Sequence, residues 1–114
     1  MIMFSFFAEA AVASYVLVVA SASVPTVNID KTCRAIVAAV KAQDDPSFRE
    51  EFSACMKGQL DARQEMIEKW SDYPASDKQA CVNTTGYLPN YVEWLGCFET
   101  SQMVRAIEKR ERAR

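Results

Sequence analysis

The sequence predicts a small all-α domain of four helices, built from two helical hairpins and stapled by disulfides, which follows an N-terminal hydrophobic helix or signal peptide. Three observations lead to this prediction. Apolar residues in the body of the chain recur at helical spacing. A residue suited to capping precedes each of these periodic segments. All four cysteines lie in the same part of the chain, where no segment predicts a strand as strongly.

The first 22 residues differ from the rest of the chain in composition. No Lys or Arg precedes Lys31, and the apolar run closes with Ala20-Ser21-Ala22, which has the form of a signal-peptidase site. We therefore expect residues 1–22 to be a signal peptide and residues 23–114 to be the helical domain. Because no basic residue precedes the run and Glu9 lies within the apolar stretch, a retained membrane-anchoring helix is the alternative.

The first helix is predicted over residues 30–42. Asp30 is of the residue type that caps a helix. One face of this helix is apolar and carries Ile29, Cys33, Ile36, Val37 and Val40. The segment is therefore expected to be amphipathic, with this face toward a core.

The second helix is predicted over residues 46–72. Asp45 supplies a capping carboxylate, and Pro46 takes the one helical position that tolerates proline. A stripe of mostly apolar residues continues until Pro74 stops the helix. The core residues expected on this stripe are Phe52, Met56, Ile67 and Trp70. Truncation of Phe52 to alanine is expected to cost about 3 to 5 kcal/mol.

The third and fourth helices each begin with a capping box, in which a polar residue is followed three positions later by Gln or Glu. Ser76 with Gln79 predicts a short third helix, which residues 83–86 terminate. Asn90 with Glu93 predicts the start of the fourth helix. The core residues expected on the fourth helix are Leu95 and Phe98.

The cysteines are expected to form two disulfides, because an even number in a short chain behind an export-like leader is typical of an oxidising compartment. Spacing alone allows three pairings. Cys33 and Cys55 each lie nine residues, or about 13.5 Å, from the turn between the first two helices, so they face each other in an antiparallel hairpin. A bond from Cys55 to Cys81 would join sites at very different distances from their connection. We therefore predict Cys33–Cys55 and Cys81–Cys97.

Several functional classes are excluded by what the sequence lacks. The chain has no His, which rules out Ser-His-Asp and Cys-His nucleophilic sites and HExxH zinc sites. It has no CxxC for a redox pair, a zinc ribbon or an iron–sulfur loop. Residues 30–99 carry 8 basic and 12 acidic side chains, which does not suit nucleic-acid binding. We expect no enzymatic activity, no cofactor and no metal site.

Two stretches of the sequence are distinctive: CMKGQLDARQEMIEKW at residues 55–70 and SDKQACVNTTGYLPNYVEWLGCFE at residues 76–99. They resemble a group of small exported four-cysteine helical proteins of bacteria with no established activity. The most specific shared features are the capped run from Tyr91 to Glu93 and the four-cysteine layout. The resemblance implies export and an all-helical domain, and it implies no active-site residues.

Aromatic side chains supply the main candidate for a binding surface. Tyr73, Tyr87, Tyr91 and Trp94, together with Trp70, surround the predicted junction of the two hairpins. There they are placed to line a groove for a peptide or a small apolar ligand. Packing in the core is the simpler interpretation of the same rings.

Three further features are interpreted as solvated surface. The acidic pairs Asp44-Asp45 and Glu50-Glu51 lack the geometry of a cation site or an acid–base pair. The basic side chains of residues 105–114 suit the C-terminus of a helix, with contact to anionic lipid or a partner as the alternative. Residues 83–85 satisfy the glycosylation sequon, which has little meaning in a bacterial protein.

The sequence favours an exported, non-catalytic helical module that binds an unknown protein or a small apolar ligand in the periplasm or outside the cell. The first alternative is an accessory subunit of an envelope complex, anchored by residues 1–22 and facing the periplasm. The second is a thiol–disulfide enzyme. Without a CxxC motif we expect reduction to loosen the domain rather than create a reactive thiol, and Cys81, near Lys78 and a helix start, is the exception to test.

Overall fold

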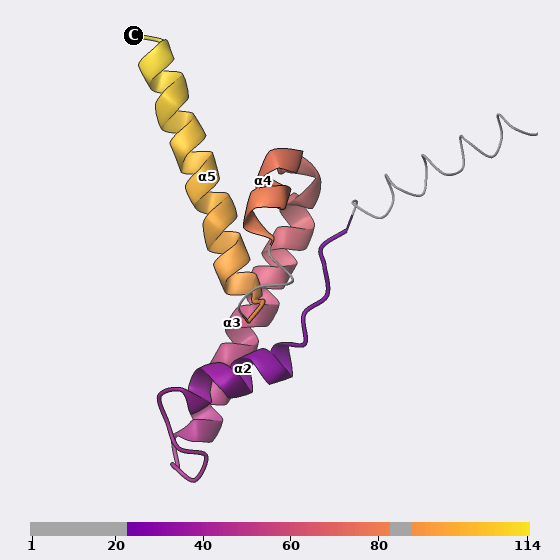
Figure 1. Cartoon of the computed structure of the whole chain (residues 1–114), viewed down its shortest axis with the longest axis vertical. Coiled ribbons are helices and arrows are strands. Elements are labelled where there is room, and N and C mark those ends of the chain that lie inside the picture. The colour runs from indigo at the N-terminus through magenta and orange to yellow at the C-terminus, as the bar shows by residue number, and fades with distance from the viewer. Residues whose placement is uncertain (1–22, 83–87) are drawn as a thin grey trace, which may run out of the picture.

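The computed structural model describes residues 23–82 and 88–114, and every regular element within them is a helix. In chain order these are α2 (Ile29–Ala38), α3 (Phe48–Lys69), the short 3₁₀ helix η1 (Trp70–Asp72), α4 (Ala75–Cys81) and α5 (Tyr91–Arg112) (Figure 1). The predicted all-α fold of four helices is confirmed. The predicted leader, residues 1–22, and the predicted stop of the third helix lie outside the described residues.

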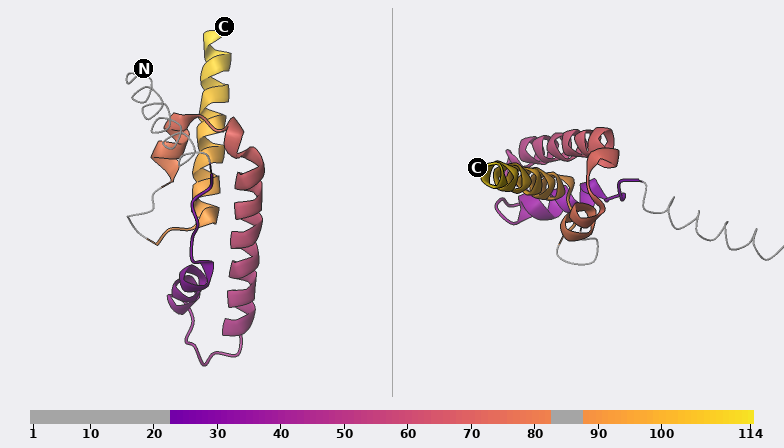
Figure 2. Two further views of the ribbon diagram at one scale, coloured as in Figure 1. Left: turned by 90° about the vertical axis from the view of Figure 1, so that its right-hand side faces the viewer. Right: turned by 90° about the horizontal axis from the view of Figure 1, so that it is seen from above.

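The long helix α3 organises the domain. α2 packs on α3 alone, whereas α5 packs on both α3 and α4. α5 runs in the same direction as α3, since its start lies beside Gln59 and its next turns lie beside Trp70. The C-terminal part of α5 consequently extends beyond the other helices (Figures 1 and 2).

α2 is capped by Asn28 and not, as the sequence suggested, by Asp30. The side-chain oxygen of Asn28 accepts a hydrogen bond from the backbone N–H of Lys31 at 3.1 Å. Asp30 lies inside the first turn, where it forms an ion pair with Arg34 at 2.7 Å. The helix ends at Ala38, earlier than predicted, so Val40 lies outside it and is exposed.

α3 begins at Phe48, two residues beyond the predicted start. Asp45 does not cap it, because its Oδ1 accepts hydrogen bonds from the backbone N–H and the hydroxyl of Ser47 in the turn before the helix. These bonds hold the pKa of Asp45 below its usual value. The end is as predicted: α3 continues as η1 to Asp72, just before Pro74.

α4 begins at Ala75, and Ser76 forms no capping hydrogen bond. Pro74 takes the N-cap position with extended backbone, which leaves Ser76 inside the first turn. The capping box predicted at Ser76 is therefore wrong. The cap predicted at Asn90 is confirmed, since its side-chain oxygen accepts a hydrogen bond from the backbone N–H of Glu93 at 2.7 Å.

Replacement of Asn90 by alanine is expected to lower the free energy of unfolding by about 1 kcal/mol, the usual cost of losing an N-cap. Asn90 is buried, so water cannot easily replace its bond to the Glu93 backbone. Ser76→Ala is the matched control and should change the stability little, because Ser76 caps nothing. Urea denaturation of the two variants measures the difference, and equal costs would contradict the assignment of the cap.

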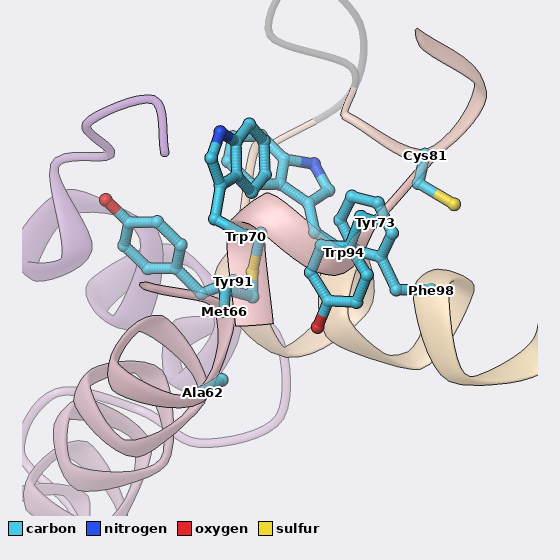
Figure 3. Packing of buried hydrophobic residues seen from close by; sticks show 8 residues of the cluster. All are labelled: Ala62, Met66, Trp70, Tyr73, Cys81, Tyr91, Trp94 and Phe98. Atoms are coloured by element: carbon cyan, nitrogen blue, oxygen red, sulfur yellow. The ribbon is translucent and has the colours of Figure 1, made fainter. Parts of the chain in front are cut away.

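The hydrophobic core joins α3, η1, α4 and the first half of α5. Its buried members are Ala62, Met66, Trp70, Tyr73, Cys81, Tyr91, Trp94 and Phe98 (Figure 3). The expectation that Trp70 and Phe98 are core residues is confirmed. The expectation for Ile67 is wrong, since 41% of it is exposed. Its neighbour Met66 faces the core, and consecutive helical residues point about 100° apart.

The remaining predicted core residues, Phe52, Met56 and Leu95, are only partly buried. The guanidinium of Arg34 lies 4.9 Å from the centre of the Phe52 ring, at the edge of the α2–α3 contact. Truncation of Phe52 therefore removes less buried surface than the sequence suggested, and a cost of 3 to 5 kcal/mol is too high for it.

Both predicted disulfides are confirmed. Cys33 joins Cys55 with their Cα atoms 5.7 Å apart, which fixes α2 on α3. Cys81 joins Cys97 with their Cα atoms 5.5 Å apart, which fixes α4 on α5. Because two structural disulfides persist only where thiols are not kept reduced, the pair indicates a non-reducing, extracellular type of compartment.

A second link between α4 and α5 is the ion pair of Asp77 and Arg105. The guanidinium donates two hydrogen bonds to the buried carboxylate, at 2.8 Å and 2.5 Å. These bonds, and the charge of Arg105, hold the pKa of Asp77 below its usual value. The pair ties the start of the short helix to the middle of the long one.

The Asp77–Arg105 pair is expected to make the domain sensitive to acid. Because the pKa of Asp77 is lower in the folded than in the unfolded state, its contribution is fully present above about pH 4 and is lost as the pH falls through the folded value. Urea midpoints measured from neutral pH into acid should fall less steeply for Asp77→Asn than for the natural chain. Equal slopes would show that other carboxylates cause the acid sensitivity.

Candidate binding groove between α2 and α5

An opening lies where α2 approaches the start of α5. Both helices pack on α3 and not on each other. The segment that leads into α5 passes above α2 (Figure 2, left). Leu88 and Pro89 form this segment. The hydroxyl of Thr32 donates a hydrogen bond to the backbone oxygen of Pro89 at 3.0 Å and bridges the two sides.

Two depressions meet at Leu88, and together we call them the α2–α5 groove. The larger has a volume of about 540 Å³ and is lined by Ala35, Ile36, Ala39, Leu88, Asn90 and Glu93. The smaller has a volume of about 220 Å³, lies toward the start of α2 and is lined by Thr26, Val27, Asn28, Lys31, Thr32, Leu88, Pro89 and Trp94.

The larger depression is mainly apolar and carries a charge only at its rim. Ala35 lies on α2 and Ala39, one turn later, is its C-cap residue, and their small side chains leave the space that the depression occupies. Ile36 stands at the edge and is 40% exposed. Glu93 lines the larger depression and Lys31 the smaller one, so the two depressions carry opposite charges.

Both walls of the groove are held in place by bonds to α3. The Cys33–Cys55 disulfide holds α2 in place. On the other side, the side-chain oxygen of Gln59 accepts a hydrogen bond from the backbone N–H of Tyr91 at 2.8 Å. Both partners of that bond are buried, so the first turn of α5 is fixed on α3. Both walls of the groove are therefore fixed by bonds within the chain.

One end of the groove is closed by residues 23–28, which we call the N-terminal strap. The Tyr91 hydroxyl donates a hydrogen bond to the backbone oxygen of Pro25 at 3.0 Å and accepts one from the backbone N–H of Val27 at 2.8 Å. Val24 and Val27 pack against the core. Ser23, the residue after the predicted cleavage site, begins this segment.

The described aromatic rings follow the simpler of the two interpretations, packing in the core, and not that of an open binding surface. Tyr73 and Tyr91 are buried in the core, and burial raises the pKa of the Tyr73 hydroxyl. Trp94 is also buried, but it lines the smaller depression. Tyr87 lies outside the described residues. The four rings therefore do not form one exposed surface, and only Trp94 is shown to contribute to the groove.

The residues that line the larger depression were not predicted as a site. Ile36 was assigned to a core face, and Ala35 and Ala39 carry no functional group that sequence analysis could single out. Leu88 lies between the last two helices, outside every periodic segment. The only available signal was the amphipathic character of α2, which does not show where a neighbouring helix leaves space.

The charged features lie apart from the groove floor. Glu50 and Glu51 are exposed in the first turn of α3, and Asp44 is exposed before it. Arg105 pairs with Asp77, whereas the remaining basic residues of α5 are exposed in its last turn. In the described ranges, 23–82 and 88–114, no group of acidic or cysteine side chains could hold a metal ion. The sequon, residues 83–85, lies outside these ranges.

Comparisons of the chain with protein-family models, with curated proteins and with solved structures gave no match. No helix in the described part of the chain is long and apolar enough to cross a membrane. The interpretation of the groove therefore depends on its own geometry and on the two disulfides.

Proposed function

We propose that this protein is an exported, non-catalytic binding module, periplasmic or secreted, that takes an apolar segment of a partner protein into the α2–α5 groove. The observation that carries the proposal is the larger depression, a mainly apolar hollow between α2 and the start of α5. Its volume of about 540 Å³ lies within the usual range for binding pockets, about 300 to 1,000 Å³. A small apolar ligand fits the same chemistry.

The opposite charges of Glu93 and Lys31, one in each depression, give a bound segment a preferred direction. A bound segment with a basic side chain toward Glu93 and an acidic one toward Lys31 has complementary charge at both ends. Export is supported by the two disulfides and by the Ala20-Ser21-Ala22 sequence directly before the strap.

Site-specific photo-crosslinking in the exporting cell tests the proposed site. A benzophenone amino acid at position 36 should crosslink to a discrete partner, because Ile36 lines the larger depression. The same amino acid at position 60 is the matched control, since Leu60 is also half-exposed but lies on α3, outside the groove. Ala39→Arg, introduced together with the position 36 label, should abolish the crosslink. Crosslinks of equal yield at both positions, or at neither, would refute the proposal.

A membrane-anchored accessory subunit is the second candidate, favoured by the apolar run in residues 1–22 that no basic residue precedes. The mass of the native protein distinguishes the two candidates. A chain that starts at Ser23 has lost the anchor, whereas a chain that still carries residues 1–22 supports the anchored subunit.

A further inference from the structure

The face of α5 that points away from the core carries a continuous stripe, which we call the outer stripe. It consists of Val92, Gly96, Thr100, Met103 and Ile107, spaced three or four residues apart. Val92 is 48% exposed, Met103 63% and Ile107 44%. All buried residues of α5 lie on the opposite face. The domain itself therefore leaves an apolar helix face without a partner among the described residues.

Gly96 and Thr100 are the two small residues of the outer stripe. The Thr100 hydroxyl donates to the backbone oxygen of Gly96 at 2.9 Å, so its hydrogen bond is made within the helix. A Cβ atom on Gly96 would meet nothing within 4 Å, and the residue has an ordinary helical backbone. Glycine weakens a helix interior, yet nothing in the described part of the chain requires it here. A glycine on an exposed helix face permits close approach by another molecule.

We propose that a second copy of this chain packs on the outer stripe, with the two α5 helices antiparallel. In this arrangement Val92 lies opposite Ile107 of the second copy, and Gly96 lies opposite Met103 of the second copy. The midpoint of both pairs falls between residues 99 and 100, so one two-fold axis makes each contact twice. Met103, the most exposed of the large apolar side chains in the outer stripe, then meets Gly96, which has no side chain.

The charges of α5 favour the antiparallel direction. Residues 91–100 carry only Glu93 and Glu99, both acidic. Residues 101–114 carry five basic and two acidic side chains. Antiparallel packing places the acidic half of each helix beside the basic half of the other, and it also opposes the two helix dipoles. Parallel packing would place like charges together.

Glu99 is the charge nearest the two-fold axis. The pKa of Lys69 on α3 is raised by its bond to Glu65 and, more weakly, by the charge of Glu99. The outer stripe shares no residue with the α2–α5 groove, so this inference does not depend on the proposed function.

Sedimentation analysis of the protein as purified from the oxidising compartment, with its N-terminal mass recorded, tests the inference. The natural chain should reach twice its monomer mass as its concentration rises. Met103→Glu should weaken the dimer by about tenfold or more. Leu60→Glu, at a half-exposed position on α3, is the matched control and should leave the dimer intact. A natural chain that stays monomeric at every concentration overturns the inference.

Gly96→Leu separates an interface role from a structural one. Because a Cβ at this position meets no atom of its own chain, the variant should fold with an unchanged or higher melting temperature. It should nevertheless lose the dimer, because leucine fills the hollow that Met103 of the second copy occupies. A Gly96→Leu variant that dimerises as well as the natural chain contradicts the proposed contact.

Engineered disulfides distinguish the two directions of packing. All four natural cysteines are already paired, so added cysteines report on the interface alone. The double variant Val92→Cys with Ile107→Cys should form a covalent dimer under mild oxidation, and the single variant Val92→Cys should not. Efficient crosslinking of the single variant would show parallel packing and overturn the antiparallel arrangement.

Discussion

Replacing Phe98 by alanine is expected to lower the free energy of unfolding by about 3 to 5 kcal/mol. Phe98 is fully buried, stacks on the ring of Tyr73 with centroids 3.9 Å apart, and meets Trp70 edge to face at 6.0 Å. These two rings lie on η1 and on the residue that follows it, so the cavity left by the truncation has little freedom to collapse. Since a domain of this size has a total stability of about 5 to 15 kcal/mol, the variant should be partly unfolded at moderate temperature.

Urea denaturation followed by tryptophan fluorescence measures this cost. Ile67→Ala is the control, because it removes a side chain of similar chemistry that is substantially exposed. It should cost less than about 1 kcal/mol. A Phe98→Ala cost as small as that of Ile67→Ala would mean that the stacked rings are not the centre of the core.

Removal of the Cys33–Cys55 disulfide, by replacing both cysteines with alanine, is expected to cost about 3 kcal/mol. The effect should be concentrated in α2. This helix packs only on α3 and contributes no fully buried residue to the main core cluster, although Ile29 packs against it, so the disulfide is its one covalent attachment to the rest of the described domain. Hydrogen exchange should show that the α2 amides lose protection while those of α3 and α5 keep it.

The matched variant lacks the Cys81–Cys97 disulfide and should loosen α4 instead, with α2 unaffected. If both variants lost protection evenly across the domain, the helices would not be attached independently. Reduction of the natural chain should combine the two effects. Under reduction, Cys81 should alkylate at pH 6 no faster than the other cysteines, and a much faster reaction at Cys81 would favour the thiol–disulfide enzyme.

The fold was predictable where it depends on local spacing. The helical periodicity located the long helices, and the equal distances of Cys33 and Cys55 from their turn identified the first disulfide. The short third helix was placed by a capping box at Ser76 that the structure does not contain. The capping boxes at Ser76 and Asn90 look alike in sequence, yet only Asn90 caps its helix. The difference arises because Pro74 takes the N-cap position of α4, two residues before Ser76.

The groove was not predictable, because it depends on space left between helices that are distant in sequence. Ala35 and Ala39 matter only because Leu88 lies across from them. Tyr91 was a candidate for a ligand-binding ring, but its hydroxyl binds the strap instead. Neither relation has a signature in the spacing of residues along one helix.

The bond between Tyr91 and the N-terminal strap has a consequence for the order of folding. The partners of the Tyr91 hydroxyl lie 64 and 66 positions earlier in the chain, whereas the first disulfide closes over a separation of 22. A chain that is threaded through a membrane from its N-terminus delivers the strap first and Tyr91 much later. The α2–α3 hairpin closes early, and docking of the strap waits for α5. Until then, the backbone at residues 23–28 stays open to proteases.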